Sequence, residues 1–494
     1  MLFQSYIFIF LFLPIVLVGY YGLNHYGKDR LAKVFLMLSS FAFYAYANFN
    51  YVILLAGSIL VNYGLLQGLK KSEIEEDTPE RVQRKRKRIL ALGIALNVGF
   101  LFYYKYYGFF LSNMNRLFDQ NFVLDHVLLP LGISFFTFQQ ITVLVDEYRE
   151  EAEITSFLDY ALYISCFPHL LSGPIPLAGE MIPQYNDPNR KKIDFGYLKQ
   201  GIILFTIGLF KKIILADAFA TGADWGYGNI SQLDTISVIL TSLFFALQVY
   251  FDFSGYSDMA RGVGKLLHLD LPINFDSPFK AGSYGEFWRR WHISLYRFMT
   301  RYLYIPLGGS RKGNFRQMLN TMIIFTVSGL WHGAQWTFIT WGVVNGVLVV
   351  LSQKGKHIFA KIPSLVQRLL ILTTFTFTTI FFRISQLQDV DDFFRKLCDF
   401  KGMKINESLV AGFNLDEFWY LIKIMKLDQM AYSTIMISVI MTVLAIVVLF
   451  LCENSNQIAE KENTSIMRGA FYAVIFIWSI ISLSAVNSFI YFNF

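Results

Sequence analysis

The sequence predicts an all-α protein that crosses a lipid bilayer many times. Of its 494 residues, 54% are hydrophobic and only 16% are charged, and its mean hydropathy is +0.43. Soluble domains carry about a quarter of their residues as charged side chains. The apolar residues also fall into runs of about twenty, the length a helix needs to cross the hydrocarbon core. Backbone polar groups in lipid must be paired within the segment, so these runs are expected to be helical.

The apolar runs predict about 11 to 13 transmembrane or re-entrant helices, because several runs are short enough to enter the bilayer without crossing it. The first run has no basic flank and no small-residue cleavage site, so we expect a retained helix rather than a signal peptide. The candidate segments, by residue number, are 3–23, 31–48, 50–69, 89–110, 125–145, 156–172, 197–216, 233–253, 317–334, 336–352, 365–384, 430–452 and 468–488.

The connections between these runs carry the charge. Residues 70–88 hold eight Lys or Arg and five acidic residues, which predicts a cytoplasmic loop by the positive-inside rule. Residues 385–429 alternate charges with aromatic residues, which favours an interfacial amphipathic segment over a folded extramembrane domain. We therefore expect a single integral-membrane domain over 1–494. The net charge of +7 is explained by membrane orientation, and no nucleic-acid partner is expected.

Familiar cofactor and metal motifs are missing from the sequence. It has no phosphate-binding loop, no dinucleotide fingerprint, no nucleophile elbow and no paired-histidine zinc motif. Three cysteines do not make a disulfide framework. We expect no bound cofactor and no metal.

Two histidines lie within the stretch Tyr284–Gly346, where a polar side chain at membrane depth calls for a functional explanation. His332, in SGLWHGAQW, has small neighbours that let a ligand or another backbone come close. A buried neutral imidazole can accept a proton from a hydroxyl group, which is the task of a general base. His292 lies in FWRRWHISLYRF. For both histidines, a structural hydrogen bond between helices is the alternative.

Further polar residues occur in apolar surroundings. Asp252 and Asp258 lie in VYFDFSGYSDMARG, and Arg261 or the arginines near His292 are available as partners. Arg289 and Arg290 could anchor the chain in lipid headgroups or contact the phosphates of an acyl carrier. Asp146, Glu147 and His169 are weaker candidates for contact with a substrate. The polar residues concentrate between about 130 and 346 without an internal repeat, which favours one reaction chamber over a transport pathway.

The segments FWRRWHISLYRFMTRYLYIPLGGSRKG and GLWHGAQWTFITWG resemble the signature of the membrane-bound O-acyltransferase family, in particular its bacterial alginate O-acetyltransferase branch. Three upstream segments, VYFDFSGYSDMARG, LPLGISFFTFQ and FPHLLSGPI, resemble motifs of the same branch. The resemblance implies a helical assembly around a central tunnel, with a catalytic core at 100–350. An acyl thioester would enter from the cytoplasm and a hydroxyl acceptor from the far side.

The resemblance also implies roles for individual residues. His332 matches the family's catalytic histidine and His292 its second polar position, whereas the branch's WGxxHG pattern reads WGVVNG here, with Asn345 in place of histidine. We expect His332 to be the base and His292 to orient it or stabilise charge. Residues expected to shape or line the chamber are Trp331, Gln335, Trp336, Asn345, Asp252, Asp258, Arg289 and Arg290.

The C-terminal sequence SFIYFNF resembles FIYF-type endings of polysaccharide acylation proteins. This suggests that Tyr491 relays the acyl group to a partner, with an interfacial aromatic belt as the alternative.

The function expected from these features is acyl transfer, with acetyl-CoA or an acyl carrier as donor and an extracytoplasmic polysaccharide as acceptor. The resemblance implies a multi-pass protein of the cell membrane with a secreted or membrane-anchored esterase-like partner. D-alanyl transfer to teichoic acid from a carrier protein is an alternative within the family. A proton-coupled transporter or flippase is the alternative of a different class.

Overall fold

A computed structural model describes residues 1–74, 78–122, 128–151, 154, 156–400, 405–414, 423–424, 432–461 and 465–485. These residues form helices with no named strand, and their one isolated β-bridge joins Phe275 and Trp291. This confirms the predicted all-α class.

Seven helices in the described part of the chain are long and apolar enough to cross a bilayer. Other expected segments form shorter or less apolar helices, such as α6 (Ile133–Tyr148), α10 (Phe195–Phe210) and α24 (Ile466–Ile481). The protein is thus a multi-pass membrane protein. The seven helices are Phe8–His25, Phe49–Ser72, Pro79–Phe118, Thr235–Leu266, Trp336–Lys354, Ser364–Arg383 and Ser433–Leu451.

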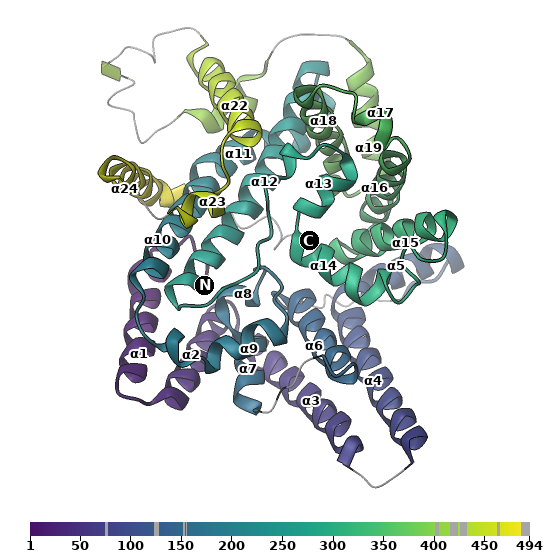
Figure 1. Ribbon diagram of the computed structural model, residues 1–494. Helices are drawn as coiled ribbons and strands as arrows, with labels where there is room; N and C mark the ends of the chain where they lie inside the picture. The colour runs from purple at the N-terminus through teal and green to yellow at the C-terminus, as the bar shows by residue number, and fades with distance from the viewer. Residues whose placement is uncertain are drawn as a thin grey trace. The chain divides into compact units, whose positions relative to one another are not determined.

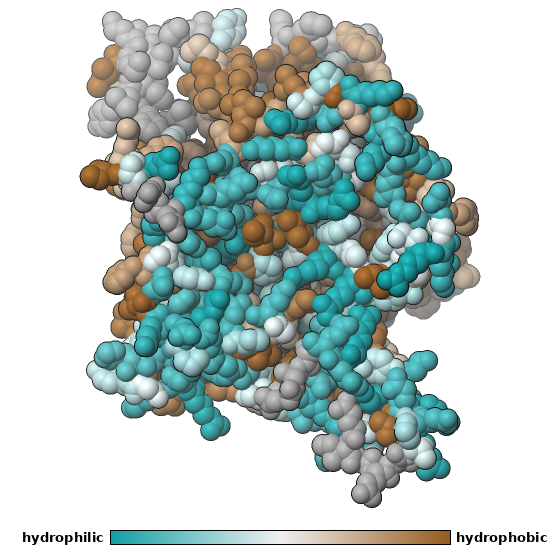
Figure 2. Space-filling model, in the orientation of Figure 1, coloured by the Kyte–Doolittle hydropathy of each residue, from teal (hydrophilic) through white to brown (hydrophobic). Residues whose placement is uncertain are grey.

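Part of the apolar surface meets no protein. On α22 (Ser433–Leu451), Ile440, Val443 and Leu444 are each at least half exposed. Figure 2 shows this helix as a hydrophobic patch. Such a surface suits contact with lipid chains.

The predicted loop at 70–88 is largely helical, so the prediction was wrong there. Helix α3 (Phe49–Ile74) continues into its start, and α4 (Pro79–Leu101) begins near its middle. Lys, Arg and Glu are good helix formers, and proline is favoured in the first turn of a helix. The charged residues at 70–88 therefore mark the end of the apolar runs, whereas the helices continue into the charged segment.

The chain divides into two compact units, Met1–Ile202 with Ala260–Pro272 and Ile203–Met259 with Ile273–Phe494. In the first, α1 (Leu13–His25) packs on α2 (Asp29–Ala45), and α4 packs on α6. His169 is buried in this unit, on α8 (Phe167–Leu170), with its Nδ1 3.0 Å from Nε2 of Gln139.

The second unit contains the stretch Tyr284–Gly346. Its helices α15 (Asn314–His332) and α16 (Trp336–Lys354) lie side by side (Figure 1). A Cβ on Gly329 would lie 2.2 Å from the Phe338 carbonyl oxygen, and a Cβ on Gly342 would lie 2.4 Å from that of Phe325. Only glycine allows the two backbones to come this close. The crossing therefore fixes the end of α15, where His332 lies.

Helix α19 (Leu387–Cys398) covers the start of the expected interfacial segment at 385–429. Its Val390 and Phe393 pack in a core cluster with Ile380 and Ile384 of the same unit. The apolar side of α19 thus contacts protein. An interfacial position of the whole segment stays a prediction, because part of it lies outside the described residues.

We expect Gly329→Ala to lower the midpoint of thermal unfolding in detergent by about 1–3 °C, because overpacking typically costs about 1–3 kcal/mol and a chain of this length shifts by about 1 °C per kcal/mol. Gly99→Ala on α4 is the control, since its new Cβ would meet nothing within 4 Å. Equal midpoints for the two variants, measured by tryptophan fluorescence, would contradict the tight crossing.

Candidate active site

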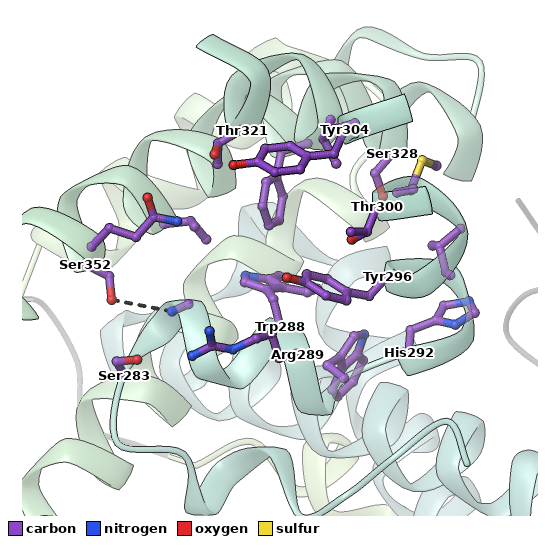
Figure 3. Close-up of a pocket in the computed structure, with 18 of the residues that line it drawn as sticks. Ser283, Trp288, Arg289, His292, Tyr296, Thr300, Tyr304, Thr321, Ser328 and Ser352 are labelled. Atoms are coloured by element: carbon purple, nitrogen blue, oxygen red, sulfur yellow. Dashed lines mark hydrogen bonds between the residues drawn. The ribbon is translucent and has the colours of Figure 1, made fainter. Parts of the chain in front are cut away.

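A cavity of about 440 Å³ lies among α13 (Tyr284–Arg290), α14 (Ile293–Met299), α15 and α16 of the second unit (Figure 3). His292 and His332 both line it. Aromatic rings form part of its wall, hydroxyl groups another part, and two cations lie in its lining. The aromatic members are Trp288, Trp291, Tyr296, Tyr304, Phe325 and Trp341, the smaller hydroxyl members are Ser283, Thr300, Ser310, Thr321, Ser328 and Ser352, and the cations are Arg289 and Lys356.

His332 is the last residue of α15 and is only 6% exposed. Its ring centroid lies 4.8 Å from that of Trp331, 4.9 Å from that of Phe382 and 5.4 Å from that of Trp341. The interplanar angles of 63° to 83° are those of edge-to-face contacts. These rings fix the plane of the imidazole and keep much of the surrounding water away.

His292 occupies the turn between α13 and α14 in a left-handed backbone conformation, with φ 46°. The side chain is 3% exposed, and its ring lies edge-to-face with Phe253 at 4.7 Å. Within the described residues neither ring nitrogen has a hydrogen-bond partner. Burial lowers the pKa of His292 to about 3, so its ring is neutral at physiological pH and offers one N–H donor and one acceptor.

Trp331 connects the two histidines. Its ring lies 4.8 Å from His332 and 6.0 Å from His292, and the indole is 4% exposed. The sequence predicted that these three residues belong to one site. The structure brings both histidines to one cavity, with the indole in contact with each.

The two arginines before His292 have different environments. Arg289 is exposed and lines the cavity, as does Lys356 at the start of α17 (Lys356–Phe359). Figure 3 shows Arg289 on the same side of the cavity as Ser283 and Ser352. Arg290 instead bonds Oε1 of Glu286 through Nη2 at 2.7 Å and through Nε at 3.0 Å. Arg290 is thus held by an acid outside the cavity lining.

Asp252 and Asp258 lie outside the cavity lining and form ion pairs with two consecutive lysines. Lys212 Nζ lies 2.9 Å from an oxygen of Asp252 and 2.9 Å from one of Asp217. Lys211 Nζ lies 2.7 Å from Oδ2 of Asp258. The sequence offers Arg261 or the arginines near His292 as partners, whereas the ion pairs described above are with lysines, and Arg261 Nε donates to the Leu271 carbonyl. The lysine pair inside the apolar run at 197–216 was the signal that could have identified them.

Three other predicted residues lie apart from the cavity lining. Gln335 and Trp336 are exposed at the start of α16, and the Trp336 side chain is 53% exposed. Asn345 is fully buried, accepts a hydrogen bond from the Tyr284 hydroxyl and donates to the Trp341 carbonyl. Tyr491 lies outside the described residues.

Sequence reasoning missed several hydroxyl-bearing residues that line the cavity. Tyr296, Thr300 and Tyr304 follow His292 at intervals of four, and Ser328 precedes His332 by four. Residues four apart share one face of a helix, so this spacing was available in the sequence. Among the described residues, no group of three or more His, Cys, Asp or Glu side chains could hold a metal ion.

The fold and the cavity define a multi-pass membrane protein with a histidine-centred, partly desolvated site. Comparison with known proteins agrees with this class. The model of the membrane-bound O-acyltransferase family matches residues 86–388, and the chain belongs to this family. It is therefore an acyltransferase. This excludes the alternative prediction of a transporter or flippase.

Three proteins with similar sequences illustrate how similar this chain is to known acyltransferases. The peptidoglycan O-acetyltransferase of Helicobacter pylori is 36% identical, over 100% of this chain and 98% of that protein. The "Probable alginate O-acetylase" of Pseudomonas putida is 37% identical, over 72% of this chain and 71% of that protein. The teichoic acid D-alanyltransferase of Streptococcus thermophilus is 28% identical, over 45% of this chain and 56% of that protein.

The neutral state of His292 predicts a pH dependence of stability. Between about pH 3 and 6.5 the unfolded imidazole binds a proton that the buried ring does not. Stability from this group is therefore fully present above about 6.5 and is lost as the pH falls toward 3. We expect the unfolding midpoint in detergent to fall more between pH 7 and 5 for wild type than for His292→Asn. Asparagine tolerates the left-handed backbone and does not titrate. Parallel midpoint curves for the two proteins would contradict the assignment.

Proposed function

We propose that this protein transfers an acetyl group from a cytoplasmic thioester, acetyl-CoA or an acetylated carrier, to a hydroxyl group for O-acetylation of an extracytoplasmic polysaccharide. The placement of two buried histidines in one aromatic cavity with cations in its lining carries this proposal. The alignment over nearly the full length of a peptidoglycan O-acetyltransferase makes peptidoglycan the first polymer to test. The D-alanyl alternative has weaker support, because its relatives align over less than half of this chain.

The proposed reaction needs no metal and no nucleotide hydrolysis, because a thioester is already activated. His332 takes the proton of the acceptor hydroxyl as the oxygen attacks the thioester carbonyl carbon. The resulting oxyanion accepts a hydrogen bond from the N–H of neutral His292. The C–S bond then breaks, and the thiolate leaving group receives the proton from His332. The two histidines thus have separate roles, one as base and one as donor.

The aromatic contacts support these roles. Rings around His332 limit its contact with water, which strengthens hydrogen bonds inside the cavity and disfavours hydrolysis of the thioester. Fixed ring planes also restrict the histidines to a narrow range of directions, which matters because effective positioning supplies much of the rate in acyl transfer.

The cationic side of the cavity fits an anionic donor. Arg289 and Lys356 are both exposed, and neither forms an ion pair within the described residues. The segment from Arg289 to Arg316 is rich in Lys and Arg, which favours a cytoplasmic position for this side. Phosphate groups of coenzyme A or of a carrier's phosphopantetheine would find charge-assisted hydrogen bonds here. We place the acceptor and an esterase-like partner on the opposite side of the membrane.

We expect His332→Ala to lower acetyl transfer by about 10³-fold, within the range of about 10²–10⁴ for loss of a general base. The assay uses protein in nanodiscs, labelled acetyl-CoA and a peptidoglycan fragment as acceptor. His25→Ala, a change of an exposed histidine on α1, is the control and should keep full activity. Transfer by His332→Ala at the wild-type rate would overturn the proposal.

We expect Arg289→Gln and Lys356→Gln each to raise the KM for acetyl-CoA about 10-fold, equivalent to about 1.4 kcal/mol. The KM for acetyl-pantetheine, which has no phosphate, should not change. Lys361→Gln, at an exposed lysine outside the cavity lining, is the matched control. Equal effects on the two donors would place phosphate recognition elsewhere.

A further inference from the structure

The backbone around His292 is held by a short strip of chain, residues 274–276. Phe275 forms an antiparallel bridge with Trp291, and the Asp276 N–H donates to the Arg290 carbonyl at 3.1 Å. The Ile293 N–H donates to the Asn274 carbonyl at 3.0 Å. The strip therefore pairs with the chain on both sides of His292.

His292 needs this support because its conformation is unfavourable. A non-glycine residue in the left-handed region costs about 1–2 kcal/mol, and it persists only where its surroundings determine it. His292 is also the N-cap residue of α14, yet its side chain makes no capping hydrogen bond. The first N–H groups of α14 therefore require an acceptor from elsewhere.

Asn274 supplies that acceptor with two oxygens. Its carbonyl accepts from Ile293 N–H, and its side-chain Oδ1 accepts from Ser294 N–H at 3.1 Å. These are the two residues that follow His292. Asn274 is 1% exposed and Ser294 is 2% exposed, so both hydrogen bonds are shielded from water. One residue, distant in sequence, thus replaces the cap that the histidine does not provide.

Only an Asn or Asp side chain suits this position well. The carbonyl contact is available to any residue, but the contact to Ser294 needs a side-chain oxygen at the length of asparagine. The Nδ2 of Asn274 has no hydrogen-bond partner within the described residues, so the amide nitrogen is not needed to hold the helix. The oxygen is the part of the side chain that acts on α14.

We propose that Asn274 is a positioning residue for His292: by capping α14 from the side, it holds the left-handed turn that directs the imidazole into the cavity. It does not line the cavity and acts only through His292. The inference rests on the proposed function for its kinetic consequence.

The test is a double-mutant cycle in nanodiscs with labelled acetyl-CoA and the peptidoglycan fragment. We expect Asn274→Ala to lower kcat about 100-fold, the loss that a displacement of about 1 Å can cause, with the donor KM changed less than about 3-fold. Asn274→Asp keeps the backbone carbonyl and a side-chain oxygen in place of Oδ1, so it should recover most of kcat. In a His292→Ala background, Asn274→Ala should cause no further loss, because its effect passes through the missing ring.

The control is Asn62→Ala, which removes a buried asparagine bonded to Asn97. It should lower the unfolding midpoint and leave kcat within about 2-fold, which separates general destabilisation from positioning. If Asn274→Ala does not accumulate in membranes, Asn274→Ser, whose hydroxyl is too short to reach Ser294, takes its place in the cycle.

Additive losses in the cycle would overturn the inference, as would an Asn274→Ala enzyme with wild-type kcat or an Asn274→Asp enzyme that folds yet stays as slow as the alanine variant. These failures are distinct from failure of the proposed function. The latter would appear as wild-type protein without acetyl transfer, or as an active His332→Ala variant.

Discussion

Buried ion pairs determine how two segments of the second unit pack against each other. Lys211 and Lys212 lie on η4 (Lys211–Ala216). Lys211 pairs with Asp258 and Lys212 with Asp252, and both aspartates lie on α12 (Thr235–Leu266). An unpaired charge at such positions would cost several kcal/mol, so the two segments can pack only in a register that satisfies both pairs. Phe253 follows Asp252 directly and contacts the ring of His292. The ion pairs thereby fix a helix that contacts His292 in the candidate site.

The two histidines line the same cavity, but different backbone structures hold them there. His332 ends a helix whose position is set by a glycine crossing, and rings from α16 and α18 (Ser364–Arg383) surround it. His292 lies in a strained turn between two short helices and is held by a paired strip. The position of His332 thus depends on close helix packing, and that of His292 on backbone hydrogen bonds. Trp331 contacts both rings, so it is the residue through which a substitution in one support can affect the other histidine.

In the proposed reaction, the composition of the cavity would separate binding of the donor from the chemical step. Aromatic rings gather around the histidines, where low polarity strengthens each hydrogen bond to a reacting atom. Cations lie in another part of the lining, where an exposed charge costs little and can attract an anionic carrier. Two acidic residues outside the cavity lining form ion pairs: Glu286 with Arg290, and Asp258 with Lys211. Among the described residues, the cavity lining therefore places no carboxylate beside the two histidines.

The sequence by itself determined the all-α membrane class, because hydropathy runs are local properties of the chain. Short motifs also predicted that the two histidines and Trp331 lie together, and the structure brings them to one cavity. The sequence could not determine which lysines pair with Asp252 and Asp258, that Asn345 bonds Tyr284, or that Trp336 is exposed. The helical course of residues 79–88 is a different case, because helix propensity within the sequence accounts for it and only the charge pattern concealed it. Asn274 gives the clearest case: nothing adjacent to it indicates a cap for α14. Such contacts join residues far apart in the chain, so only the packing of the helices decides them.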